Sequence, residues 1–500
     1  MPGCYWHDEL GCFLVVYVDD MKMTGPIKGV DEAWKRLRKG LEMDDPEPAG
    51  RYLGCQHEIG EVTVKGKKYK TMTYNMEEFF DSCVDRYIEA AGGKAKMKKV
   101  STPFVDEVLK KGPCAPSADG PWVECPWCMA RFAENELKRG LGNKYEDGTK
   151  ADVSRATGSA EFDKSKRGQL ADSASSVLMK ILYGARMARF DLLRAVCALA
   201  CKVTQWDADC DRQLHRLMCY IHSTRHYRMV GWVSQDEADS NPVLFTDADF
   251  AGCHSTMRST SGVHMEIAGR NVKFPTSGVS KKQSASSYST PEAEIVAGAF
   301  GLRTEGVPGL ALMNVLTGCQ CKLRFREDNQ AMIRVCETGK NPTMRHIGRT
   351  HGVSVAWLFE RFQEDDNHIG YCDTADQAAD IYTKAFVDQG KWDHACELAG
   401  IIDPKRIQQV IIDHAERWDR QEAGEKIKPK EDSANKAAPC PPRGVDHDVF
   451  VEQLGSVGFR EDNWTHSGTE KLKEYPSLHA MLVEKCESTW ACDGPTTVGE

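Results

Sequence analysis

Four acidic residues recur where the sequence predicts that strands end or helices begin. Asp247 ends a short apolar strand in NPVLFTDADFAG, and Glu294 lies in the first turn of the helix that STPEAEIVAGAFGL predicts. Asp328 follows the alternating strand CKLRFRE, and Asp380 lies in a helix after a strand near 369–371. Strand ends and helix starts of an α/β sheet can meet at one edge. We therefore expect these four side chains to lie together.

A group of carboxylates without basic partners needs a cation between its members, because like charges repel. Mg²⁺ and Mn²⁺ prefer oxygen ligands, and two such ions about 3.5–4 Å apart suit phosphodiester hydrolysis. Each residue also has a structural alternative. Asp247 fits a turn, Asp328 a helix N-cap and Asp380 the surface. Glu294 and its neighbour Glu292 would both complement a helix dipole.

A second acidic pair, Asp19 and Asp20, follows the run FLVVYV near the start of the chain. The run is β-branched and aromatic, so it predicts a buried strand. Two carboxylates at the end of such a strand are costly unless a cation such as Mg²⁺ lies between them. A polar hairpin turn explains the same residues, because Asp is a common turn residue.

The sequence CPWC contains a third candidate site, at Cys125 and Cys128, with Cys114 upstream. This spacing suits a zinc ion, but tetrahedral zinc takes four ligands. No further Cys follows before Cys197 and Cys201. Ordinary unpaired thiols are the favoured interpretation, and zinc is the less favoured one.

The elements that would position these residues form an α/β (α+β) chain of five segments. Residues 1–112 are rich in strands, residues 113–172 are an insertion or linker, and residues 173–236 are helical. Residues 241–388 are a compact mixed domain. Residues 389–500 begin with an amphipathic helix and continue as a linker and tail.

The mixed domain carries the most detailed prediction. A strand at 243–246 precedes a hairpin at 261–276 that turns near Gly269. Thr290 fits the N-cap of the next helix, with Pro291 at its first position. Because this region has its own strands, helices and apolar faces, we expect the segment from about 238 to 390 to fold alone.

The composition bounds the class of protein. With 41% hydrophobic and 28% charged residues, the chain suits a soluble globular protein. No apolar stretch approaches the ~20 residues of a membrane helix, and no secretory signal is evident. We therefore expect no membrane partner and a cytoplasmic or nuclear location, not secretion. The 20 cysteines are scattered, which favours free thiols in a reducing compartment.

The net charge of −9 argues against a basic coat over the whole chain, but not against a local basic groove. Two stretches are candidates for such a groove, VTVKGKKYK at 62–70 and KAKMKK at 94–99. Solvated surface faces explain both stretches equally well. Composition alone therefore leaves nucleic-acid binding open.

Taken in order, these motifs resemble the later reverse transcriptase and the ribonuclease H of a copia-type LTR retrotransposon Pol polyprotein. The resemblance covers roughly 1–112 and 173–388, and it is most specific in the second region. The matching stretches are YVDDM, RYLGCQHEI, LYGARMARFDLLRAV, TDADFAG, RSTSGVHMEIAG, SKKQ, STPEAE, EDNQAMI and QAADIYTKAF.

The resemblance implies a truncated polymerase palm, a helical thumb or connection, and a ribonuclease H-like mixed sheet flanked by helices. The catalytic and metal-binding residues would be Asp247, Glu294, Asp328 and Asp380. Asp19 and Asp20 would be metal ligands of the polymerase. The cofactor would be Mg²⁺ or Mn²⁺. The substrate would be an RNA–DNA hybrid, and other retroelement Pol segments would be partners.

Between the two glutamates of STPEAE, the family points to the second. Glu292 lies two residues before Glu294, about 200° around a helix, so we assign it to the helix dipole. The family's Lys-His-Ile and aromatic-His pair are replaced by MRHIGRTHGVSV, with His346 and His351.

A palm needs a third carboxylate from an earlier strand, which would precede residue 1. We therefore expect ribonuclease H-type cleavage from this chain, and polymerase activity only from a full-length parent. The alternative is a catalytically inactive retroelement remnant or a nucleic-acid-binding protein. The four carboxylates favour the enzyme, and the incomplete palm and the acidic net charge favour the remnant.

Overall fold

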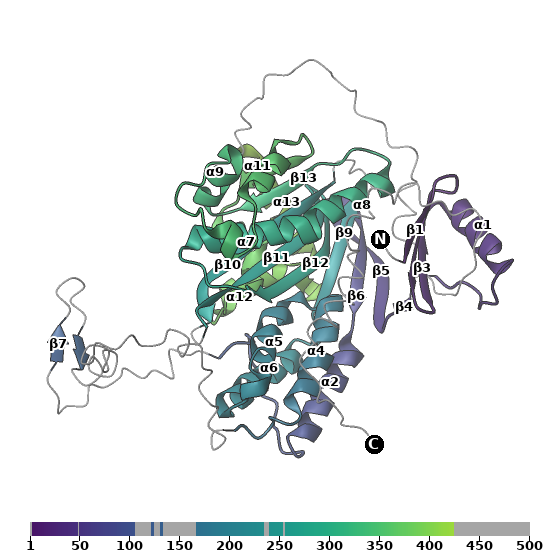
Figure 1. Ribbon diagram of the computed structural model, residues 1–500. Helices are drawn as coiled ribbons and strands as arrows, with labels where there is room; N and C mark the ends of the chain where they lie inside the picture. Colours follow the sequence, from purple (N-terminus) through teal and green to yellow (C-terminus); the bar gives the residue numbers. More distant parts are fainter. Residues whose placement is uncertain are drawn as a thin grey trace, which may run out of the picture.

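The computed structural model describes residues 3–48, 50–105, 122–124, 131–133, 167–234, 240–253 and 256–424. Within them the chain is a mixed α/β protein built on one ten-stranded sheet (Figure 1). The sheet contains β4 (Arg51–Tyr52), β5 (Cys55–Val64), β6 (Lys67–Asn75), β9 (Arg228–Ser234), β10 (Asn241–Cys253), β11 (Arg258–Gly269), β12 (Val272–Lys282), β13 (Leu323–Glu327), β14 (Asn367–Tyr371) and β15 (Ile401–Ile402).

The strands follow the order β14-β13-β10-β11-β12-β9-β6-β5-β4, with β15 beside β9. Strands β10, β11 and β12 form an antiparallel meander, as the predicted hairpin requires. Strand β13 runs parallel to β10, and β14 parallel to β13. Parallel neighbours need long crossover connections. Here helices supply them: α7 (Thr290–Gly301), α8 (Val307–Thr317), α9 (Gln330–Thr338), α10 (Ile347–Thr350) and α11 (Val355–Gln363).

Successive residues of β10 face opposite layers, because strand side chains alternate. Leu244 packs in a core with Phe325 and Met332, under α7, α8, α9 and α11. Val243 and Phe245 belong to a second core on the other side of the sheet. Figure 1 shows α7 and α8 crossing one face of β10–β12. The second core is covered by α2 (Glu77–Ala90), α4 (Ala174–Ala188), α5 (Leu193–Ala200), α6 (Ala208–Ser223) and α12 (Gln389–Leu398).

Strand β9 joins two parts of the sheet that the sequence places in different segments. It pairs with β6 over six residues, from Tyr69↔Ser234 to Tyr74↔Met229. It also pairs with β12 at Val272↔Val233. The sequence analysis identified no strand here. The sheet therefore runs through the predicted segments 1–112, 173–236 and 241–388 without a break.

A separate three-stranded sheet lies at the N-terminal side, beside β4 and β5 in Figure 1. It contains β1 (Cys4–His7), β2 (Cys12–Tyr17) and β3 (Asp20–Thr24), packed on α1 (Ile27–Arg38). The strand predicted over Phe13–Val18 forms as β2, but only one of its faces is buried and it ends at Tyr17. Leu14 is buried against Trp34, because α1 covers one face of this sheet, whereas Val18 lies in the turn after β2 and is 84% exposed.

The remaining elements refine the predicted boundaries. The N-cap of α7 is Ser289, not Thr290, since the Ser289 hydroxyl accepts the Glu292 N–H at 3.4 Å. Asp380 lies in a short 3-10 helix, not a longer α-helix. The amphipathic helix of the tail begins at Ile407. The other elements are η3 (Phe190–Leu192), η4 (Val203–Gln205), η5 (Leu302–Gly306), η6 (Thr374–Asp376), η7 (Ala378–Tyr382), η8 (Pro404–Arg406), α13 (Ile407–Gly424), β7 (Trp122–Glu124) and β8 (Arg131–Ala133). None of the helices in the described ranges is long and apolar enough to cross a bilayer.

Candidate active site

Three of the four predicted acids meet beside the carboxyl end of β13, although Asp247 lies within β10 and does not end that strand as predicted. Ligand oxygens of Asp247, Glu294 and Asp328 all lie within 4.8 Å of one another. Asp247 is 2% exposed and Glu294 is 4% exposed, so this is a cluster of largely buried carboxylates. It is the one group of at least three metal-compatible side chains among the described residues.

The fold explains why these residues converge. Strands β10 and β13 are parallel neighbours, and Phe245 pairs with Arg326. Asp247 and Asp328 each lie two residues beyond that pair, so they lie at the same level along the two strands. Helix α7 brings Glu294 to them across the face of β10. Its close approach depends on Gly301, where a Cβ atom would lie 2.7 Å from Cγ2 of Thr246.

The fourth predicted acid, Asp380, lies beside this group but is paired with a lysine. Lys384 Nζ lies 2.6 Å from Oδ1 of Asp380 and 3.7 Å from Oδ1 of Asp247. The Thr383 hydroxyl donates a hydrogen bond to Oδ2 of Asp247. The sequence analysis missed Lys384. Its spacing of four residues from Asp380 is the signal that could have found it, because such pairs meet on helical turns.

Asp247, Glu294 and Asp380 hold their protons more tightly than isolated carboxyl groups, because the pKa of each is raised. Burial and the nearby Glu327 raise the pKa of Glu294 to about 11. Burial and the charge of Asp247 raise the pKa of Asp380 to about 7. Burial also raises the pKa of Asp247, although Lys384 opposes this effect. Without a cation, the cluster is therefore partly protonated at neutral pH.

Glu327 is a buried acid of the site that the sequence analysis did not select. Its carboxylate accepts hydrogen bonds from the Thr246 hydroxyl at 3.0 Å and from the Asn329 N–H at 3.1 Å. Burial raises its pKa well above the usual range. The signal was present in CKLRFRE: Glu327 shares a strand face with the apolar Leu323 and Phe325, so it had to be buried.

The residues fit a divalent metal ion. Oε2 of Glu294 is buried and has no hydrogen-bond partner in the described part of the chain. An unpartnered buried carboxylate oxygen is costly, and a cation would satisfy it. Three carboxylates on separate elements are the hard oxygen donors that Mg²⁺ and Mn²⁺ take. Asp247, Glu294 and Asp328 are the residues that would hold such an ion.

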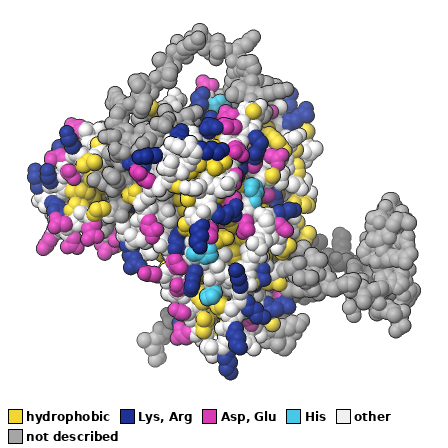
Figure 2. Space-filling view, turned by 180° about the vertical axis from the view of Figure 1, so that it is seen from behind, with side chains coloured by type: hydrophobic (Ala, Val, Ile, Leu, Met, Phe, Trp, Pro, Cys, Tyr) yellow, Lys and Arg dark blue, Asp and Glu magenta, His cyan; other side chains and the backbone are white. Residues whose placement is uncertain are grey.

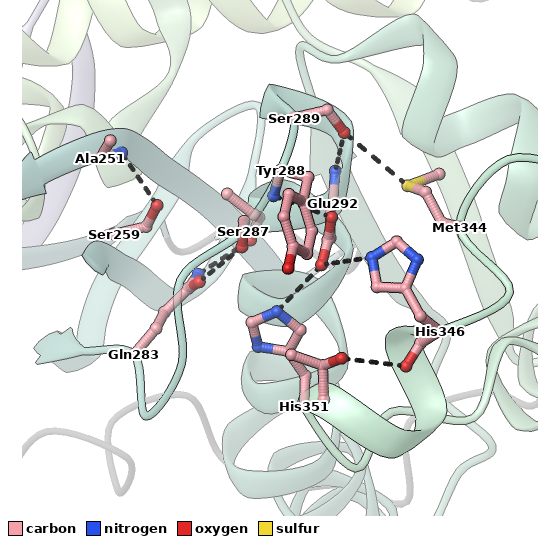
Figure 3. A network of polar contacts seen from close by, with 12 residues as sticks. Ala251, Ser259, Gln283, Ser287, Tyr288, Ser289, Glu292, Met344, His346 and His351 are labelled. Atoms are coloured by element: carbon pink, nitrogen blue, oxygen red, sulfur yellow. Dashed lines mark hydrogen bonds and ion pairs between the residues drawn. The ribbon is translucent and has the colours of Figure 1, made fainter. Parts of the chain in front are cut away.

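Glu292 occupies a different environment from Glu294, although both lie in the first turns of α7. Its Oε1 lies 3.1 Å from Nε2 of His346 and 3.0 Å from Nε2 of His351 (Figure 3). Its Oε2 accepts the backbone N–H of Tyr288 at 3.0 Å. A carboxylate only accepts, so both imidazoles donate N–H groups to it. Glu292 therefore does more than complement the helix dipole, which was its predicted role. Its hydrogen bonds also link the start of α7 to the segment that carries both histidines.

The other predicted site residues lie apart from the acidic cluster. Asp19 lies in the turn between β2 and β3, and Asp20 begins β3 opposite Tyr17. Neither belongs to the group of metal-compatible ligands. Cys125 and Cys128 lie outside the described residues. A cavity of about 480 Å³ lies elsewhere, between α2 and α6, and none of the four predicted acids lines it.

The surface carries both signs of charge. Figure 2 shows the face of the molecule opposite to that of Figure 1. Lys and Arg side chains are spread over it among Asp and Glu, without one dense basic patch. In the candidate groove at 94–99, Lys94, Lys96, Lys98 and Lys99 are exposed. Arg194 lies closer to the acids, since its Nε donates to the Thr383 carbonyl at 2.8 Å.

Comparison of the chain with family models, with curated proteins and with solved structures finds no match.

Proposed function

We propose that this chain is a metal-dependent nuclease that cleaves the RNA strand of RNA–DNA hybrids, as a ribonuclease H-like part of a copia-type Pol polyprotein. The observation that carries the proposal is the meeting of Asp247, Glu294 and Asp328 oxygens within 4.8 Å, from three separate elements. The strand order β12-β11-β10-β13-β14, with two antiparallel pairings followed by two parallel ones, supports the same conclusion. It is the arrangement expected of a ribonuclease H-like mixed sheet.

The chemistry follows from the donor set. A divalent ion held by these carboxylates would activate water and polarise the scissile phosphate. Thr383 fixes Asp247 through its hydroxyl, and Thr374 donates to Oδ2 of Asp328 at 2.8 Å. These bonds orient the two aspartates before any ligand binds. The hybrid would be recognised through its backbone and its 2′-hydroxyl groups, with little reading of bases.

Asp328→Asn tests the proposal, because it keeps the shape of the side chain and removes its charge. With a labelled RNA–DNA hybrid and Mg²⁺ or Mn²⁺, we expect the full chain to cut the RNA strand. We expect Asp328→Asn to lower the cleavage rate by at least about a hundredfold. Asp365→Asn is the matched control, since Asp365 is an exposed aspartate near α11. It should cleave like the unaltered chain.

Circular dichroism of each variant separates loss of chemistry from loss of folding. A folded chain that leaves the hybrid intact in both metals would contradict the nuclease and leave the alternative, an inactive remnant that binds nucleic acid. The described part of the chain brings no third metal-compatible side chain to Asp19 and Asp20, so we propose that it does not extend a primer. Primer extension by this chain that Asp19→Asn abolishes would contradict that statement.

A further inference from the structure

The ammonium of Lys384 lies beside two carboxylates of the acidic cluster, those of Asp380 and Asp247. Its Nζ is 2.6 Å from Asp380 and 3.7 Å from Asp247. Once a first ion takes Asp247, Glu294 and Asp328, Asp380 is the one predicted acid left, and a second ion would have to share Asp247 with the first. Asp380 itself is absent from the metal-compatible group. The fourth acid is thus already neutralised by a cation of the chain.

The segment that carries Lys384 is held in place. The Lys384 N–H donates to the Asp380 carbonyl at 2.9 Å. Thr383 is bound to Asp247 through its hydroxyl and to Arg194 through its carbonyl. The segment also packs tightly on β11, since a Cβ at Gly262 would lie 2.7 Å from Cγ2 of Thr383. The backbone that carries Lys384 is therefore fixed, and its 38% exposed side chain contacts both Asp380 and Asp247.

We propose that Lys384 replaces the second metal ion, so that this nuclease binds a single divalent ion at Asp247, Glu294 and Asp328. The inference rests on the proposed nuclease function. Its physical basis is charge: a divalent ion and an ammonium together offset much of the repulsion among four carboxylates. An ammonium also offers three N–H donors, which suits an oxygen that gains negative charge when the phosphodiester breaks.

Manganese binding tests the inference independently of cleavage. Mn²⁺ titration of the full chain, followed by electron paramagnetic resonance, should give about one bound ion with an uncoupled spectrum. Lys384→Met keeps much of the side-chain length and removes the charge. We expect this variant to bind about two ions whose spectra are magnetically coupled, because two ions about 4 Å apart interact. Lys391→Met, at an exposed lysine of α12, is the control and should bind like the unaltered chain.

Cleavage then gives a second readout. The unaltered chain should show a first-order dependence of rate on free Mg²⁺, whereas Lys384→Met should be slower by about a hundredfold at low Mg²⁺ and approach second-order dependence. Two coupled ions in the unaltered chain would overturn the inference while leaving the nuclease intact. If the chain binds one uncoupled ion but does not cleave the hybrid, the proposed nuclease function is wrong, and the proposal that Lys384 replaces the second ion stands. Binding that Lys384→Met leaves unchanged would also overturn the inference.

Discussion

Two carboxylates two residues apart on α7 show how strongly the environment decides a residue's role. Glu292 is surrounded by donors, from His346, His351 and the Tyr288 N–H. Glu294 faces other acids, and its Oε2 has no partner among the described residues. The first carboxylate is satisfied by the folded chain and the second is satisfied only by a cation. The same substitution should therefore act in opposite directions at the two positions.

Glu→Gln at each position tests this contrast, and each variant is the matched control for the other. Glu292→Gln replaces one of the two acceptor oxygens with an NH2 donor, which then faces either the Tyr288 N–H or the two imidazoles, so we expect it to lower the free energy of unfolding by about 2 kcal/mol. Glu294→Gln removes a carboxyl group whose pKa is raised to about 11. In chelator we expect it to raise the free energy of unfolding by roughly 2 kcal/mol.

Urea denaturation measures both changes, and hybrid cleavage completes the comparison. Glu294→Gln should abolish cleavage and Mn²⁺ binding while stabilising the metal-free chain. Glu292→Gln should retain Mn²⁺ binding under conditions where it is folded. Equal loss of Mn²⁺ binding in both variants would mean that the choice between the two glutamates is wrong.

At the scale of elements, helix α13 attaches the C-terminal part of the described chain to the sheet through a buried histidine. His414 Nε2 lies 2.9 Å from the Gly269 carbonyl, so it donates a hydrogen bond as a neutral ring. Its ring meets Trp232 edge to face at 5.5 Å. Burial, helped by the charge of Lys273, lowers the pKa of His414 to about 4. Protonation of this histidine therefore opposes folding.

The lowered pKa of His414 sets the direction in which the free energy of unfolding changes with pH. Because the folded pKa lies below the unfolded value of about 6.5, the unfolded chain takes up the proton first, and stability is lost as pH falls from about 6.5 to 4. This residue should make the free energy of unfolding about 2 kcal/mol lower at pH 5 than at pH 7. Glu294, with its raised pKa, acts in the opposite direction.

A comparison with His414→Gln isolates the histidine. Urea denaturation at pH 7 and pH 5 should show a smaller loss of stability in this variant, by about 2 kcal/mol. His368→Gln, at an exposed position of β14, should keep the pH dependence of the unaltered chain. An unchanged pH dependence in His414→Gln would show that folding does not lower the pKa of this ring.

The local elements of the mixed region could be predicted from sequence, and their long-range pairing could not. Alternation in CKLRFRE and the Ser-Thr-Pro start of α7 are signals within a few residues, and both elements form. The pairing of β9 with β6 joins residues about 160 apart in the chain, such as Tyr69 and Ser234. No local periodicity contains that partner. Lys384 was missed for a related reason: its importance depends on Asp247, which lies on another strand.

At the scale of the whole molecule, the cores do not follow the predicted boundaries. The core that contains Val243, Phe245 and Ala268 also contains Phe80 on α2 and Leu217 on α6. Cutting the chain at about 238 and 390 would therefore expose one apolar face of β10–β12. The sequence led us to expect that this segment folds alone, and the structure gives reason to expect the opposite.

Expression of 238–390 beside a longer piece tests this expectation. We expect 238–390 to aggregate or to lack cooperative unfolding, and residues 50–424 to unfold cooperatively, because only the longer piece keeps both layers over the sheet. Circular dichroism melting and size-exclusion chromatography measure the difference. A soluble monomer of 238–390 with a sharp thermal transition would restore the original expectation of an autonomous domain.

Because the site depends on the missing side chain at Gly301, mutations can disable it at positions that contact neither a metal ion nor a substrate. This glycine lies two turns from Glu294 on α7 and touches Thr246 on the strand below. Any added side chain would lift one end of the helix and tilt the other, so that Glu294 would no longer reach the aspartates. A random screen for chains that fold but do not cleave should therefore recover substitutions at Gly301 as readily as at the acids. The spacing of the carboxylates could be adjusted, by selection or by an engineer, without altering any of them.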